Sequence, residues 1–222
     1  MALGRAWRYR RDMAALLTVI DHLVVATPSL QHAVDDVASL LGVRPILGGQ
    51  HPQWGTQNAL LSLGPRVYLE IMGPDGTGDR SLLSRPFGID QLQSWKLVTW
   101  VVRSADLRMI VSAAQSEGIE LGRIQQGSRK RPGGTLLEWE MTDLLMDREG
   151  GAFPNFIDWG RSVHPATSAP AGCLLERLTV SHPKGAWLSE VLARIGIDLV
   201  VEEGPVRLEA VVAGPKGRVV LR

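Results

Sequence analysis

The stretch "GGQHPQWGTQNALLSLGPRVYLEIMGPDG", residues 48–76, contains two apolar runs that are each closed by glycine. Apolar runs bounded by glycine and proline are typical of β-strands. In the second run, alternation places Glu70 on one face with Tyr68 and Met72, and leaves Leu69 on the other face. A buried carboxylate is costly unless it meets a partner, so we expect Glu70 to face a cup that holds a metal or a polar ligand.

The order of elements around this stretch recurs along the chain. Residues 19–26 read as a strand and residues 29–42 as an amphipathic helix with Ser29 as a candidate N-cap and Gly42 as its stop. A second copy starts at residue 95, and a shorter, weaker third copy starts at residue 173. We therefore expect an extension at residues 1–18, a paired βαβββ domain at residues 19–160 with modules at 19–75 and 95–160, a linker at 161–172 and a partial third module at 173–222.

Composition excludes several classes of protein. The 222 residues include 24 basic and 23 acidic side chains, so no net field attracts nucleic acid. No apolar run has the ~20 residues that span a bilayer, and a single cysteine, Cys173, excludes a disulfide framework. We expect a soluble, cytoplasmic protein with a small-molecule ligand and no nucleic-acid or membrane partner, and we leave a homodimer open.

Several common catalytic motifs are absent from the sequence. It contains no G-x-G-x-x-G or Walker sequence, no H-E-x-x-H and no G-x-S-x-G. These absences argue against nucleotide-binding enzymes, zincins and α/β-hydrolases of the usual kind.

Five segments together resemble the glyoxalase-like domain proteins of the vicinal oxygen chelate superfamily. "IDHLVVAT" (20–27), "GGQHPQWGTQNALLSLG" (48–64) and "YLEIMGPDG" (68–76) match the first module of that group, whereas "RPGGTLLEWEMTD" (131–143) and "FPNFIDWG" (153–160) look like its second module. The resemblance implies an α+β fold in which tandem βαβββ modules curl into a half-barrel cup.

The resemblance also implies a divalent metal in the cup, with His22 and Glu70 as ligands from the first module. Imidazole and carboxylate suit Zn, Mn, Fe, Co or Ni. The second module departs from the pattern, because Thr99 stands where His22 does and either Ile157 or Asp158 stands opposite Glu70. In the third copy, Arg177 and Glu209 take these two positions. A four-ligand set is therefore incomplete in every pairing.

Other candidate site residues lie in the loop and strand before Glu70. His51 is a candidate third ligand or acid–base group, and the competing interpretation is a solvated loop histidine. Thr56 and Asn58 are two apart on a strand, where a hydroxyl and an amide can orient a substrate oxygen or simply cap a turn. Strict alternation places His22 on the same face as Ile20, Val24 and Ala26.

The second module offers two substrate-binding candidates. Arg131, in the basic loop "SRKRPGG", can pair with a carboxylate, although a solvated loop is the simpler interpretation. Trp139 supplies flat apolar surface for a pocket wall or for packing.

Two functions stay open at this point. One is an enzyme that chelates adjacent substrate oxygens on a metal and performs lyase, isomerase or dioxygenase chemistry, with Glu70 or His51 moving the proton. The other is a metal-free protein that binds or sequesters a small molecule, as antibiotic-resistance members of the superfamily do.

Overall fold

The computed structural model describes residues 19–76, 85–130, 136–146 and 148–222. Its strands are β1 (Ile20–Ala26), β2 (Ile46–His51), β3 (Thr56–Gly64), β4 (Val67–Pro74), β5 (Lys96–Arg103), β6 (Gln125–Lys130), β7 (Leu136–Met141), β8 (Asn155–Asp158), β9 (Leu174–His182), β10 (Glu202–Glu203), β11 (Arg207–Gly214) and β12 (Gly217–Leu221). The helices are α2 (Leu30–Leu41), α3 (Leu107–Ser116) and α4 (Gly185–Arg194), with short 3₁₀ segments η1 (Pro86–Gln91), η2 (Glu149–Gly151) and η3 (Pro165–Thr167). None of the helices in this part of the chain is long and apolar enough to cross a bilayer.

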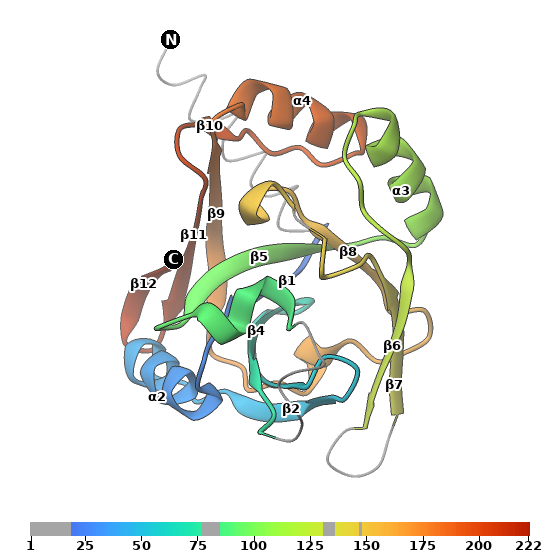
Figure 1. Cartoon of the computed structure of the whole chain (residues 1–222). Helices are drawn as coiled ribbons and strands as arrows, with labels where there is room; N and C mark the ends of the chain where they lie inside the picture. The colour runs from blue at the N-terminus through green and yellow to red at the C-terminus, as the bar shows by residue number, and fades with distance from the viewer. Residues whose placement is uncertain (1–18, 77–84, 131–135, 147) are drawn as a thin grey trace.

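An eight-stranded sheet with the order β2-β3-β4-β1-β5-β8-β7-β6 forms the centre of the molecule (Figure 1). The order is symmetric about its middle, where β1 and β5 pair antiparallel. On one side β1 pairs in parallel with β4, and on the other side β5 pairs in parallel with β8. The sequence β1–α2–β2–β3–β4 is thus repeated as β5–α3–β6–β7–β8, which confirms the α+β class and the curled-sheet architecture.

The sheet curls until its two edge strands, β2 and β6, lie against each other. Gly48 is the extra residue where the pairing of β2 with β3 shifts register. A Cβ atom at Gly48 would lie 2.2 Å from Arg129 Nη1 and 2.4 Å from Asn58 Oδ1. The missing side chain therefore leaves the space through which Arg129 crosses from β6 to reach β3.

A second sheet, of order β10-β9-β11-β12, covers the outer face of the first. Its element order β9–α4–β10–β11–β12 is again βαβββ, but β9 lies between β10 and β11 instead of at one end of its group of strands. One large apolar core joins this sheet to the helices and to the outward residues of the first sheet, among them Leu69 and Ile71 of β4. A smaller cluster that includes Val24, Met72 and Met141 fills the concave side.

The helices follow the predicted apolar pattern. In α2 the buried residues are Leu30, Ala33, Val34, Val37 and Leu41, which recur at three- and four-residue intervals. Ser29 occupies the N-cap position without a side-chain cap bond, and Gly42 ends the helix in the left-handed region at φ 83°. Asp106 caps α3 by accepting a hydrogen bond from the Met109 N–H at 2.9 Å.

Strand β1 departs from strict alternation, and the prediction that Ile20 shares a face with His22 is wrong. The ladder to β5 pairs Ile20 with Val102 and His22 with Val101, so Asp21 is a bulge residue. Ile20 consequently packs in the outer core, whereas His22 lines a pocket on the concave side. A bulge inserts one residue and reverses which face the following side chains occupy.

Strand β6 also differs from expectation, because the polar segment that includes Arg129 was interpreted as a loop. Paired with β7 from Gln125 to Lys130, it forms the edge that meets β2. The predicted substrate-binding residue Arg131 and the expected extension at residues 1–18 lie outside the described residues.

We expect Gly48→Ala to lower the free energy of unfolding by about 1–3 kcal/mol, because its methyl group would displace Arg129 and Asn58. Chemical denaturation measures this change. Gly204→Ala is the matched control: the nearest atom to its added Cβ would be 3.9 Å away, so its effect should stay within about 0.5 kcal/mol. Equal effects of the two substitutions would contradict the close approach of β2 and β6.

Candidate functional site

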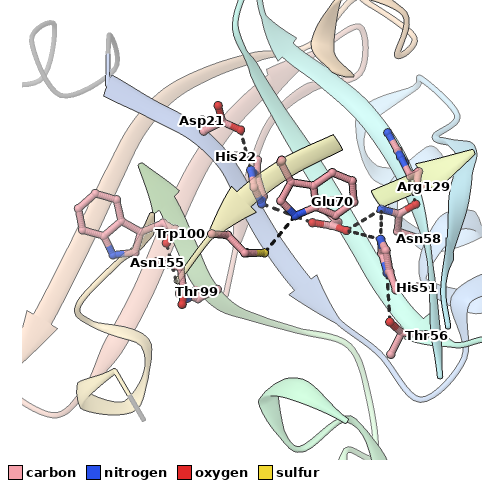
Figure 2. A network of polar contacts seen from close by, with 12 residues as sticks. Asp21, His22, His51, Thr56, Asn58, Glu70, Thr99, Trp100, Arg129 and Asn155 are labelled. Atoms are coloured by element: carbon pink, nitrogen blue, oxygen red, sulfur yellow. Dashed lines mark hydrogen bonds and ion pairs between the residues drawn. The ribbon is translucent and has the colours of Figure 1, made fainter. Parts of the chain in front are cut away.

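The Glu70 carboxylate lies at the centre of a buried polar network on the concave side of the sheet (Figure 2). Its Oε1 atom accepts a hydrogen bond of 2.6 Å from Asn58 Nδ2 on the neighbouring strand β3. Its Oε2 atom lies 3.4 Å from His22 Nε2 on β1. The bulge in β1 brings His22 to this face, and strict alternation in β4 brings Glu70 to it. The two side chains therefore contact each other within one pocket.

His22 is held by a carboxylate and by an aromatic ring. Its Nδ1 atom lies 2.8 Å from Asp21 Oδ1, and its ring stacks on Tyr68 at 4.5 Å with 18° between the planes. An ionised carboxylate only accepts hydrogen bonds, so Nδ1 carries a proton and donates it to Asp21. Nε2 and Glu70 Oε2 thus face each other at a spacing that a proton or a ligand hydrogen can bridge.

Asp21 is fully buried and surrounded by donors. His164 Nε2 lies 3.0 Å from its Oδ2 atom, and Trp159 Nε1 donates to both oxygens at 3.2 Å. Because His164 Nδ1 accepts from the Ala166 N–H, its proton must sit on Nε2. Burial alone raises the pKa of Asp21, but the hydrogen bonds that His164 and His22 make to it, with their electrostatic attraction, outweigh burial and hold this pKa well below its usual range.

His51 stands on the opposite side of Glu70. Its Nδ1 atom is 3.1 Å from Thr56 Oγ1, and its Nε2 atom is 3.4 Å from Asn58 Nδ2 and 4.0 Å from Glu70 Oε1. Burial lowers the pKa of His51, and the charge of Glu70 opposes this effect only in part. The surroundings of His51 therefore favour its neutral imidazole form. Thr56 lies behind it and supports it, while Asn58 lines the pocket.

Arg129 is the buried cation of the network, and it is a residue that the sequence analysis missed. It donates from Nη1 to Asn58 Oδ1 at 3.1 Å, which directs the amide N–H group of Asn58 toward Glu70. Arg129 and Arg131 are two apart in the same basic run, and period-two alternation would have placed both on one face had this run been recognised as a strand.

The pocket is small and has aromatic walls. Trp139, Trp159, Trp54 and Phe87 line it together with the polar residues, and its cavity volume of ≈ 30 Å³ is about that of one water molecule. Trp139 can lie over the neighbouring strand because Gly127, its partner on β6, has no side chain. The network is therefore shielded from bulk water.

The second half of the sheet carries a different pair at the equivalent register. Val24 of β1 pairs with Glu70, and Val101 of β5 pairs with Asn155. Asn155, and neither Ile157 nor Asp158, is therefore the counterpart of Glu70. Its Nδ2 atom donates to Thr99 Oγ1 at 3.1 Å, just as Glu70 faces His22 (Figure 2).

The third copy contributes nothing to the network. Glu209 lies on the second sheet and is paired with Arg222 at 2.7 Å and with Arg207 at 3.4 Å. Arg177 is on β9, opposite Val211.

A family model described as a glyoxalase-like domain matches residues 20–196. The chain belongs to this glyoxalase-like family. The match spans both halves of the large sheet and extends through β9 and α4, which confirms the resemblance drawn from the sequence motifs.

Solved structures are similar to this glyoxalase-like protein at low sequence identity. A hypothetical protein from Staphylococcus aureus has 16% identity and a TM-score of 0.60 over 90% of this chain and 83% of that chain. Methylmalonyl-CoA epimerase from Mycobacterium tuberculosis has 16% identity and a TM-score of 0.40 over 64% of this chain and 87% of that chain. A variant of the Streptomyces coelicolor epimerase in complex with 2-nitronate-propionyl-CoA has 15% identity and a TM-score of 0.44, over 66% and 97%. No curated protein matches the chain.

The donor set of this glyoxalase-like domain does not fit the expected divalent metal. His22 and Glu70 are suitable ligand types, and Asp21 orients His22 as carboxylates behind metal-binding histidines do. The repeated positions, however, hold Thr99 and Asn155, a hydroxyl and an amide, which are weak donors. Within the described ranges, no group of three or more His, Cys, Asp or Glu side chains could hold a metal ion.

We expect Asp21→Asn to lower the free energy of unfolding by about 3 kcal/mol at pH 7, because the donors around it would lose the charge that they share. A carboxylate with a depressed pKa stabilises the fold above its unfolded pKa of about 3.9, and this stabilisation is lost as the pH falls below that value. The difference from wild type should therefore shrink between pH 5 and pH 3. Denaturant unfolding at several pH values measures it.

Asp106→Asn is the control for this substitution. Asn caps a helix about as well as Asp, so this exposed site should show little change at either pH. If Asp21→Asn proved equally mild and independent of pH, Asp21 would not carry the buried charge described above.

Proposed function

We propose that this glyoxalase-like protein is an acid–base enzyme that moves a proton on a small organic molecule, in isomerase- or lyase-type chemistry. The observation that carries the proposal is the 3.4 Å approach of Glu70 Oε2 to His22 Nε2, with the other nitrogen of His22 bound to buried Asp21. Two basic atoms directed at one point form a proton acceptor.

In the proposed step, Glu70 Oε2 removes a proton from a substrate carbon beside a carbonyl group. The C–H bond breaks and an O–H bond forms on Glu70. The electron pair of the C–H bond becomes a C=C bond, and the π pair of the carbonyl group moves onto its oxygen, which gives an enolate. Return of the proton to a different face or a different atom gives an isomer. Loss of a leaving group from the enolate gives the lyase outcome. Neither outcome requires an oxidant or a reductant.

His22 can share the proton that Glu70 removes. Transfer to Nε2 creates an imidazolium ion, whose Nδ1–H already contacts Asp21 at 2.8 Å. A buried carboxylate in this position stabilises the cation and keeps the ring in one orientation. His164 and Trp159 hold Asp21 in turn, so the acceptor is fixed before the substrate arrives.

Tyr68 supplies a proton donor on the same face. Burial and the charges of Glu70 and Asp21 raise the pKa of its phenol well above the usual value, so the O–H group stays protonated. The residue lines the pocket with Glu70 and His22. We infer that its hydroxyl stabilises the developing enolate oxygen, since a fixed donor is most effective where water is excluded.

Ligand sequestration is the second candidate function. It is favoured by the small volume of the polar pocket, whose Glu70 already accepts the Asn58 hydrogen bond, and by a larger neighbouring cavity. A binding protein needs affinity without turnover, so the two candidates differ in whether a bound molecule exchanges protons.

We expect the wild-type protein in D₂O to catalyse deuterium incorporation into members of a panel of small hydroxyketones and keto acids, followed by proton NMR. Glu70→Gln should lower the exchange rate by at least about 100-fold, because the amide cannot accept the proton. Glu138→Gln, the same change at an exposed position on β7, should leave the rate unchanged.

Exchange that Glu70→Gln leaves intact would contradict the assignment of Glu70 as the base. Compounds of the panel that raise the melting temperature of the wild-type protein but never exchange would support sequestration instead.

A further inference from the structure

A second, larger cavity of ≈ 370 Å³ adjoins the polar pocket, and Phe87 and Leu144 line both. We propose that this cavity binds the body of a small amphipathic anion, with an N–H or O–H group donating to Asn155 Oδ1 and the anionic group facing Lys96. The inference rests on the proposed function in one respect only: it treats this molecule as the substrate whose reacting end meets Glu70.

The relative sizes of the two cavities support a ligand whose body lies in the larger cavity and whose reacting end enters the polar pocket. The polar pocket has room for about one water molecule, so the body of an organic ligand must lie elsewhere. The larger cavity has the volume of common small-molecule sites. Because Phe87 and Leu144 form the common wall, a ligand in the larger cavity lies directly beside the Glu70 pocket.

Asn155 provides a specific recognition group in this cavity. Thr99 Oγ1 donates to the Trp100 carbonyl at 3.3 Å and therefore accepts from Asn155 Nδ2 at 3.1 Å (Figure 2). The Oδ1 atom of Asn155 is buried and has no hydrogen-bond partner among the residues that the structure describes. Buried carbonyl oxygens are nearly always paired, and Asn155 belongs to the lining of the cavity, so we infer that a ligand held there donates to its Oδ1 atom.

The charges around the cavity favour an anion. Lys96 is exposed and lines the cavity, and Arg148 lines it as well. No Asp or Glu belongs to the described lining. The Arg148 guanidinium donates to the carbonyl groups of Glu120, Leu121 and Asp143, which fixes its charge in place and leaves Lys96 as the adaptable contact.

The remaining wall is apolar and suits an aromatic or branched body. Leu92, Val98, Leu145 and Met146 line the cavity, and Met side chains adapt to irregular ligands. Leu145 is 50% exposed, so it presents unpaired apolar surface at this site. The cavity thus combines apolar walls, one acceptor and positive charge, which defines an amphipathic anion with a donor group.

The probe 8-anilinonaphthalene-1-sulfonate carries these features, namely aromatic rings, one N–H group and a sulfonate. We expect the wild-type protein to bind it with enhanced fluorescence at one site per chain. Asn155→Leu should weaken binding at least about 10-fold, because the N–H group loses its acceptor. Gln115→Leu removes an amide group at an exposed position of α3 and should leave binding unchanged.

This pair of variants separates recognition from structure. Equal losses in Asn155→Leu and Gln115→Leu would show that the effect is not specific to this cavity, and unchanged binding in Asn155→Leu would likewise overturn the proposal. Circular dichroism and denaturant unfolding establish that each variant is folded. If Asn155→Leu does not fold, Asn155→Ser supplies the same comparison with a smaller polar side chain.

The role of charge is tested with N-phenyl-1-naphthylamine, which keeps the rings and the N–H group but lacks the sulfonate. Lys96→Met should weaken the sulfonate probe about 3- to 10-fold and leave the uncharged probe unaffected. Equal effects on both probes would contradict the anion assignment. Probe binding involves no proton transfer, so loss of deuterium exchange with intact probe binding would contradict only the acid–base function.

Discussion

The organisation of the site depends on one buried charge, the Asp21 carboxylate at the bulge of β1. The bulge turns His22 toward the concave face while Ile20 stays in the outer core. Without its donors, Asp21 would be an uncompensated charge inside a sheet, which is among the most destabilising features a fold can contain. His164 and Trp159 reach it from the segment after β8, so they link the second half of the large sheet to the orientation of His22.

The two halves of the large sheet share a topology and differ in chemistry. At equivalent register positions, one half holds His22 and Glu70 and the other holds Thr99 and Asn155. The first pair can accept and share a proton, whereas the second pair is neutral and offers a carbonyl oxygen. We propose that this asymmetry places proton transfer on one side of the cup and ligand recognition on the other. It also explains why the cup does not present the four strong donors that a symmetric metal site would need.

The sequence was sufficient to predict the fold class, because the repeated strand–helix pattern is clear. It was also sufficient to predict that Glu70 faces the concave side, because period-two alternation in β4 is unbroken. The sequence did not predict that Arg129 joins the network, because its strand β6 is polar and forms an edge of the sheet. Nor could it place Asp21, since a bulge leaves no mark in an alternating pattern, or His164, which reaches the site by tertiary packing alone. The role of Asn155 was hidden by a two-residue difference in register between the halves. Functional roles of the candidate residues stay predictions.

The tautomer of His22 tests the central claim most directly, because the proton-accepting pair exists only if Asp21 holds the proton on Nδ1. Long-range ¹H–¹⁵N correlation NMR of histidine-labelled protein at neutral pH distinguishes the two ring nitrogens. The account predicts a neutral His22 ring with a protonated Nδ1 and a bare Nε2. A ring with the proton on Nε2 and a bare Nδ1 would contradict it, since Nε2 could then accept no proton beside Glu70.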